Sequence, residues 1–155
     1  MKKGLLLTIG LFMGTTLFAQ QKLFDKFEDR DDVNTVYISK GMFKMIESLP
    51  VQLMGNKELD VRKIAGKLDK LVVLETEKKS LVSSISKEAL RIYKEEKYEE
   101  LMRISEGKER TIIYDKDLGG GKHLYALYQN SGEDVKIINL YGSLKVSELK
   151  GMIGK

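Results

Sequence analysis

Three short runs rich in isoleucine, valine and tyrosine lie close together near the C-terminus, at residues 110–115, 123–129 and 135–141. The connections between them, residues 116–121 and 130–134, are rich in glycine, aspartate, asparagine and serine. Strand-like runs separated by turn-forming residues are typical of an antiparallel meander. This is the strongest structural pattern in the sequence. We therefore expect the rest of the chain to supply helices and further strands that pack against this meander.

Residues 33–39 and the apolar run 71–75 predict two more strands. The pattern of the segment between them predicts helices. A helical connection of this kind favours a parallel strand pair joined by a right-handed crossover. The first helix is expected to end before Pro50 and to carry Met42, Met45, Ile46 and Leu49. The second is expected to begin at Asp60 as its N-cap and to bury Val61, Ile64, Ala65 and Leu68.

Further helices are expected at residues 20–29, 78–105 and 146–153. The long stretch 78–105 contains two apolar stripes, one of Leu81, Ile85, Ala89 and Ile92 and one of Tyr98, Leu101 and Met102. The stripes lie about 180° apart on a helical wheel of 3.6 residues per turn, so one straight helix cannot bury both. We therefore predict a break near residues 94–97 and two separate helices.

The first 19 residues have the form of a secretory signal peptide. Lys2 and Lys3 precede an apolar run over residues 5–18, and Ala19 offers a small residue for cleavage, although Leu17 is larger than is usual at its position. The apolar run is short for a stable membrane span. We predict cleavage near Ala19, an extracytoplasmic protein (periplasmic or secreted) and no stable membrane span after cleavage.

Removing 19 of the 155 residues leaves 136, enough for one domain with a sizeable core. We predict a single α+β domain over residues 20–155. Its sheet is expected to be mixed, with about five strands including the C-terminal three-strand antiparallel meander. Helices are expected mainly on one face of this sheet.

Charge and cysteine content exclude several classes of function. The net charge of +4 includes Lys2 and Lys3, so the mature chain carries about +2, with basic and acidic residues interspersed. Without a basic stripe, nucleic-acid binding is not expected. The chain contains no cysteine, which excludes disulfides, thiolate metal sites and cysteine nucleophiles.

Residue patterns that could carry chemistry have simpler structural interpretations. His123 is the only histidine, and we expect it at the surface beside Lys122. Residues 119–121 are three glycines that lead into a strand, which favours a hairpin loop over a phosphate-binding loop. The acidic residues 28–32 do not have the spacing of a calcium loop, and the glutamates at 95, 96, 99 and 100 are typical of a solvated helix face. We therefore predict no catalytic residue, metal or cofactor, and no enzyme activity.

Tyrosines are the least ordinary feature of the meander. They are Tyr114, Tyr125, Tyr128 and Tyr141. Either helices cover both faces of the sheet and bury these rings, which we favour, or one face presents them to a partner as an interaction surface. The methionines are expected mainly to fill gaps in the core.

Several segments together resemble the DUF4252 family of small exported proteins of Bacteroidetes-type bacteria. The resemblance is carried, in order, by residues 23–27, 36–42, 68–77, 97–102 and 137–144. It covers nearly the whole mature chain. The family has no assigned activity and supplies no catalytic motif. Its genes are described near those of envelope-stress sigma and anti-sigma factors, which implies an envelope accessory or regulatory role.

These observations predict a non-catalytic exported protein that binds another protein of the cell envelope. The alternative is a carrier or sensor of a small apolar or lipid ligand, held between the sheet and the helices. A carrier requires an enclosed apolar cavity, whereas a binding protein requires an exposed apolar patch.

Overall fold

The structure is a computed structural model that describes residues 19–48 and 64–153. Its strands are β1 (Val33–Ser39), β2 (Leu68–Thr76), β3 (Glu99–Glu106), β4 (Glu109–Gly119), β5 (Lys122–Asn130) and β6 (Val135–Gly142). Its longer helices are residues 19–27, α2 (Lys40–Ser48), α4 (Lys79–Glu95) and α5 (Val146–Ile153). Among these described residues, no helix is both long and apolar enough to cross a membrane.

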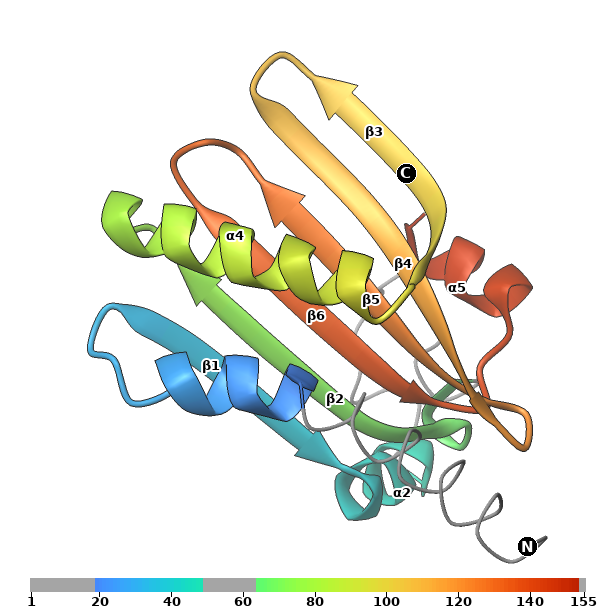
Figure 1. The fold of residues 1–155 in the computed structure, drawn as a ribbon. Coiled ribbons are helices and arrows are strands. Elements are labelled where there is room, and N and C mark those ends of the chain that lie inside the picture. Colours follow the sequence, from blue (N-terminus) through green and yellow to red (C-terminus); the bar gives the residue numbers. More distant parts are fainter. Residues whose placement is uncertain (1–18, 49–63, 154–155) are drawn as a thin grey trace, which may run out of the picture.

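All six strands belong to one sheet with the order β1-β2-β6-β5-β4-β3 (Figure 1). Every neighbouring pair is antiparallel. The prediction of a single α+β domain is confirmed. The sheet has six strands instead of about five, it is antiparallel instead of mixed, and its meander has four strands because β3 precedes the three that were expected.

β1 and β2 are neighbours, as predicted, but they run antiparallel, with Val33 opposite Thr76 and Ser39 opposite Lys70. The predicted right-handed crossover is therefore wrong. The hydroxyl of Thr76 donates a hydrogen bond to the backbone oxygen of Asp32 (2.6 Å) and accepts one from the backbone N–H of Lys78 (3.2 Å). This side chain therefore joins the starts of β1 and α4.

The segment of the second predicted helix lies only partly within the described residues. Asp60 and Val61 are outside them, whereas Ile64 and Ala65 are helical and buried. Leu68 is the first residue of β2 and is not helical. The helix therefore ends earlier, and the strand begins earlier, than the sequence suggested.

One face of the sheet, called here the first face, packs against helix 19–27 and α4 (Figure 1). The strand register places Leu74, Ile137, Tyr128 and Ile112 across from one another in one buried row. Above them lie Leu23 and Phe27 of helix 19–27 and the predicted α4 stripe of Leu81, Ile85, Ala89 and Ile92. Burial of each such side chain contributes roughly 1.5–3 kcal/mol, so this layer supplies much of the stability.

The opposite face, called the second face, has a core of its own. Phe43 of α2 and Leu149 of α5 pack there with Ile113, Tyr125 and Leu140 of the sheet, all of them buried. Helices therefore cover parts of both faces, and the expectation that they would lie mainly on one face is wrong. This second core explains why both sides of β5 are apolar in the sequence.

The predicted break after α4 is confirmed, but the segment that follows it is a strand. Lys97 adopts a left-handed backbone conformation with φ 54°, which turns the chain from α4 into β3. A β-bulge then interrupts the β3–β4 register between Glu100 and Met102. Because of this bulge, Leu101 and Met102 both pack against the second-face core.

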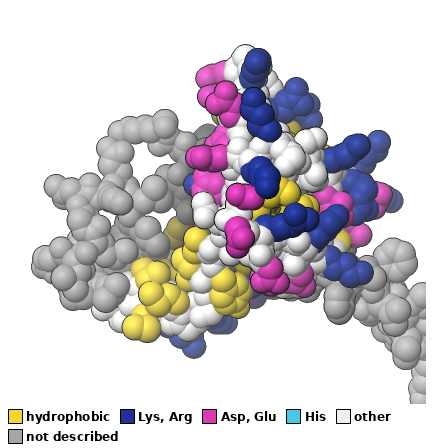
Figure 2. All heavy atoms as spheres, turned by 90° about the vertical axis from the view of Figure 1, so that its left-hand side faces the viewer, with side chains coloured by type: hydrophobic (Ala, Val, Ile, Leu, Met, Phe, Trp, Pro, Cys, Tyr) yellow, Lys and Arg dark blue, Asp and Glu magenta, His cyan; other side chains and the backbone are white. Residues whose placement is uncertain are grey.

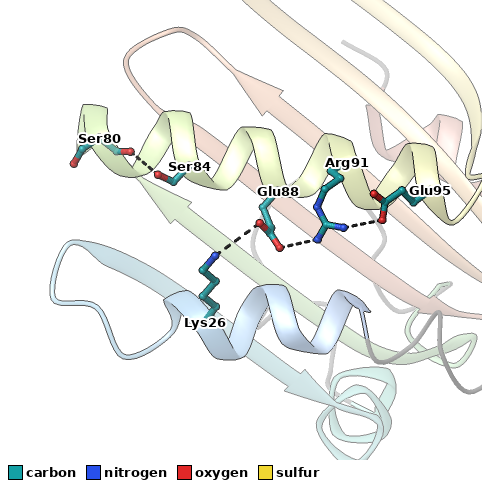
Figure 3. Close-up of polar contacts among 6 residues, drawn as sticks. All are labelled: Lys26, Ser80, Ser84, Glu88, Arg91 and Glu95. Atoms are coloured by element: carbon teal, nitrogen blue, oxygen red, sulfur yellow. Dashed lines mark hydrogen bonds and ion pairs between the residues drawn. The ribbon is translucent and has the colours of Figure 1, made fainter.

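A chain of ion pairs joins helix 19–27 to α4 on the outer side of the helical layer (Figure 3). Lys26 lies 3.7 Å from Glu88, which pairs with Arg91 at 2.8 Å, and Arg91 pairs with Glu95 at 2.7 Å. The Arg91 guanidinium is the main reason that the pKa of the Glu88 carboxyl lies below its usual value. Exposed pairs of this kind contribute little each, so the apolar layer beneath them holds the helices in place.

Candidate functional site

The four tyrosines proposed as an interaction surface lie in the core. Their exposed fractions are 8% for Tyr114, 2% for Tyr125, 2% for Tyr128 and 8% for Tyr141. Three pack on the first face, and Tyr125 packs on the second, where its hydroxyl donates to the backbone oxygen of Leu144 at 2.8 Å. Helices on both faces therefore bury these four rings, and Tyr141 also lines a hollow that opens beside Tyr37.

Burial changes the acidity of this aromatic group. It raises the pKa of Tyr141 to about 12 and is the main reason that the pKa values of Tyr93, Tyr98 and Tyr114 lie above the ordinary value of 10.0. Tyr93 contacts Tyr98 and stacks on Tyr114, with ring centroids 5.2 and 4.2 Å apart. These rings fill the layer between α4, the turn after it and the sheet.

His123 is half-buried and has a partner that sequence reasoning missed. Its Nδ1 lies 2.8 Å from Oδ1 of Asp115, a carboxylate only 9% exposed, and its ring stacks on Tyr125. β4 and β5 bring the pair together because they join at the hairpin of residues 119–121, whose three glycines have φ of 82°, 62° and 77°. The predicted hairpin loop is confirmed. Neither His123 nor Asp115 lines the surface hollows beside α4, β1 and the β5–β6 turn.

The outer side of the helical layer carries a surface hollow of about 390 Å³ between helix 19–27 and α4. Five of its lining residues are charged, namely Lys22, Glu88, Arg91, Glu95 and Glu96. A second hollow, of about 290 Å³, is lined mostly by polar residues of β4, β5 and the β5–β6 turn. A carrier of an apolar ligand needs an enclosed apolar cavity, whereas both of these hollows lie at the surface and include charged side chains in their linings. Among residues 19–48 and 64–153, no three His, Cys, Asp or Glu side chains are grouped to hold a metal ion.

Apolar side chains of helix 19–27, α4 and the sheet pack together in the layer between the sheet and the helices. This layer also contains two fully buried polar residues, Gln20 and Asn139, whose side chains are joined by a hydrogen bond of 2.9 Å. Their remaining amide atoms, Gln20 Nε2 and Asn139 Oδ1, have no partner within the described residues.

β1 is a different kind of surface, because it forms one edge of the sheet. All seven of its residues are uncharged, and its register with β2 is continuous from end to end. Val36 is 48% exposed and Tyr37 is 67% exposed. An edge strand presents unpaired backbone N–H and C=O groups, and natural proteins usually block such an edge with charges, proline or bulges. The sequence of β1 contains no proline and no charge.

α2 adds an exposed apolar side to the same corner of the molecule. It begins at Lys40, directly after the last residue of β1, and the backbone N–H of Met42 donates to the Ser39 hydroxyl at 3.4 Å. Phe43 faces the core, which leaves Met42 and Met45 48% and 61% exposed on neighbouring turns. Val36, Tyr37, Met42 and Met45 are called the edge patch below. Figure 2 looks onto the β1 side and shows hydrophobic side chains gathered in its lower part.

A hollow of about 130 Å³ opens beside Tyr37, between helix 19–27 and the strands β1 and β2. Phe24, Val72 and Tyr141 give it an apolar lining. Lys70 also lines it, with its ammonium 4.2 Å from the centroid of the Tyr141 ring. Burial lowers the pKa of Lys70. A side chain of a bound segment could reach this hollow from the β1 edge.

The sequence interpretation missed the edge patch for two reasons. Met42 and Met45 were expected in the buried stripe of their helix, whereas Phe43 is the buried residue. Val36 and Ile38 share a face opposite to that of Tyr37, but nothing in the local sequence shows that this strand lies at an edge. The available signal was the absence of charge in residues 33–39.

A comparison with known proteins agrees with the extent of this domain. The model of a family described as a domain of unknown function, DUF4252, matches residues 27–152. No curated protein matches the chain, and no solved structure does. Since the match covers most of the chain and all six strands, the chain belongs to the DUF4252 family.

Proposed function

We propose that this protein is a non-catalytic binding protein of the cell envelope and that it binds a partner protein through the edge patch. The observation that carries the proposal is an edge strand of seven uncharged residues, with Val36 and Tyr37 exposed and two exposed methionines beside it. Exposed apolar groups next to unpaired backbone groups favour a protein partner over a small polar ligand.

Strand addition is the mode of binding that this surface supports. An extended segment of the partner pairs its backbone with β1, and its alternate side chains point to the two faces of the sheet. On the first face they meet Tyr37 and the hollow lined by Phe24 and Lys70. On the second face they meet Val36 and the side of α2 that carries Met42 and Met45. Methionine suits this role because its flexible side chain adapts to different partners.

The envelope location rests on the sequence of residues 1–19, which lie mostly outside the described structure. A cleaved signal peptide places the mature protein beyond the cytoplasmic membrane, and the family resemblance implies an accessory or regulatory role there. Cell fractionation together with N-terminal sequencing tests this part of the proposal. We expect a mature chain that begins at Gln20; an uncleaved chain in the cytoplasmic fraction contradicts it.

Site-specific photo-crosslinking tests the binding surface. A photoreactive amino acid at Val36 is expected to link a second protein in living cells, and Val36→Lys in a chain with the probe at Tyr37 is expected to remove that product. The matched control is the same probe at Ile104, an exposed residue (43%) of the opposite edge strand β3. Equal products from Val36 and Ile104, or none from Val36 and Tyr37, contradict the proposal.

A further inference from the structure

We propose that a second copy of this chain occupies the β1 edge while no other partner is bound. The two β1 strands then pair antiparallel about a twofold axis through Val36, and two six-strand sheets become one. This inference rests on the proposed function, because the second copy covers the same edge patch and so controls the access of the partner to that patch. Three features of β1 and its flanks carry the argument.

The first feature is the self-complementarity of the strand. β1 has seven residues, Val33 to Ser39, so Val36 is its centre. A twofold axis there places Thr35 opposite Tyr37 of the second copy and Asn34 opposite Ile38. Directly opposed β-branched and aromatic side chains stabilise antiparallel pairs. Because β1 carries no charge, the pairing creates no like-charge repulsion within the strand.

The second feature is the distribution of charge around β1. The residues before it, 28–32, contain four acidic side chains and one arginine, whereas Lys40 and Lys44 follow it. An antiparallel pair brings the acidic end of each copy to the basic end of the other. The Val36 axis sets Asp32 directly opposite Lys40 of the second copy. A shift of the axis by one residue would instead oppose Asp32 to Ile38 or Met42.

Asp32 and Lys40 are both free to make this second contact. Asp32 pairs with Lys78 at 2.8 Å and Lys40 with Asp69 at 3.3 Å within the chain. The side chains of Asp32 and Lys40 nevertheless remain 52% and 60% exposed. Each charge can therefore approach an opposite charge across the joined edge without leaving its present partner.

The third feature is the placement of the apolar side chains. Val36 and Ile38 share the second face with α2, whose Phe43 packs in the core there. The twofold axis therefore brings both Val36 side chains, and the exposed methionines of both α2 helices, to the same side of the joined sheet. Pairing removes the most exposed apolar part of the described surface from water.

The absence of cysteine from the chain allows a direct test of the register. Three variants, Thr35→Cys, Val36→Cys and Tyr37→Cys, each carry a single thiol, and only a residue on the axis faces its own copy. We expect mild oxidation to link Val36→Cys into a dimer efficiently, and to link Thr35→Cys to Tyr37→Cys when the two are mixed. Ile104→Cys on β3 is the control. A linked fraction for Val36→Cys no higher than for Ile104→Cys, or efficient linkage of Thr35→Cys to itself, overturns the proposed arrangement.

Charge reversal gives a second test on chains without cysteine. Asp32→Lys and Lys40→Asp are each expected to weaken self-association roughly tenfold, because two ion pairs per dimer become repulsive. The double variant restores opposite charges across the edge and is expected to recover most of the affinity. Analytical ultracentrifugation of the purified wild-type protein and variants measures this. A wild-type protein that stays monomeric at all concentrations, or a double variant that is weaker than both single variants, overturns the inference.

The two proposals fail separately. If the purified protein is monomeric but the Val36 probe still links another envelope protein in cells, the second copy is excluded and the proposed function stands. If only self-linked products form in cells, the edge patch is a dimer interface and the proposed partner is excluded.

Discussion

The two edges of the sheet are built in opposite ways. β3 forms one edge and reads Glu-Glu-Leu-Met-Arg-Ile-Ser-Glu, with charged residues at both ends and in the middle. A bulge between Glu100 and Met102 breaks its register. The Arg103 guanidinium donates to both carboxylate oxygens of Glu100, at 2.8 and 2.7 Å. Charges and bulges are the devices that discourage another strand from pairing with an edge.

β1 forms the other edge and has neither device. It is uncharged, its pairing with β2 continues without a bulge, and its exposed side chains include Val36 and Tyr37. An unprotected edge risks aggregation unless something covers it. The difference between the edges therefore supports the proposal that another strand pairs with β1, and it disfavours such pairing at β3.

The largest expected effect concerns the buried tyrosine rings of the first face. Tyr141, with its pKa raised to about 12 from 10.0, stays neutral in the fold at pH values where an unfolded tyrosine ionises. The stability that this neutral ring contributes is fully present below pH about 10 and is lost as the pH rises through about 12. The loss lowers the free energy of unfolding by about 3 kcal/mol. The pKa values of Tyr93, Tyr98 and Tyr114 are also raised by burial, so their losses add to that of Tyr141 and make the total the largest effect. Circular dichroism during an alkaline titration measures the loss.

A reporter on each edge sharpens this result, because the chain has no tryptophan. Tyr93, Tyr98 and Tyr114 pack against one another near β3. The fluorescence of a tryptophan introduced on β3, Ile104→Trp, is therefore expected to change at a lower pH than that of a tryptophan introduced on β1, Tyr37→Trp. The reverse order would show that the β1 half depends more on these rings than the packing indicates.

The second expected effect concerns the β1 half, which depends on Phe43. Its side chain is 3% exposed and holds α2 on the second face. Phe43→Ala is expected to lower the free energy of unfolding by about 3–5 kcal/mol through the cavity it leaves. Urea denaturation measures this, with Met45→Ala as the control at about 0.5 kcal/mol or less. Similar losses in the two variants would contradict the assignment of Met45 to the exposed side of α2.

A third change makes β1 resemble β3. Val36→Lys places a charge in the middle of the open edge and is expected to weaken pairing there at least roughly tenfold. The free energy of unfolding should change by about 0.5 kcal/mol or less, since Val36 is half exposed. Ile104→Lys on β3 is the matched control and should leave association unchanged. Weaker association in the Ile104 variant would show that the two edges do not differ in function.

The smallest effect is expected at the ion pair of β3. Arg103→Gln removes the guanidinium that lowers the pKa of the Glu100 carboxyl, but both side chains lie in solvent. The thermal midpoint is expected to stay within experimental error, as measured by differential scanning calorimetry at low and high salt. A clear fall at low salt would mean that this pair, and not only the bulge, shapes the β3 edge.

Local sequence patterns predicted most elements of this fold but not their arrangement. The alternating runs at 110–115, 123–129 and 135–141 lie within β4, β5 and β6. β3 was predicted as a helix because its bulge turns Leu101 and Met102 to the same face, which conceals the alternation of a strand. The β1–β2 direction was wrong because the length of a connection does not decide whether a chain returns parallel or antiparallel.

The candidate site was less accessible from sequence for a related reason. The uncharged composition of residues 33–39 is visible, but edge position depends on the strand order, which arises from pairings far apart in the chain. Large rings occur both in cores and at interfaces, so the sequence alone could not decide whether the meander tyrosines are buried. Only the second layer of helices, α2 and α5, decides that Tyr125 is buried.

The direct passage from Ser39 into α2 has a mechanical consequence. Because no residue separates the strand from the helix, a twist imposed on β1 would also rotate the axis of α2. That rotation would displace Phe43 against Leu68 and Leu140, so an event at the rim of the molecule would be transmitted to its interior.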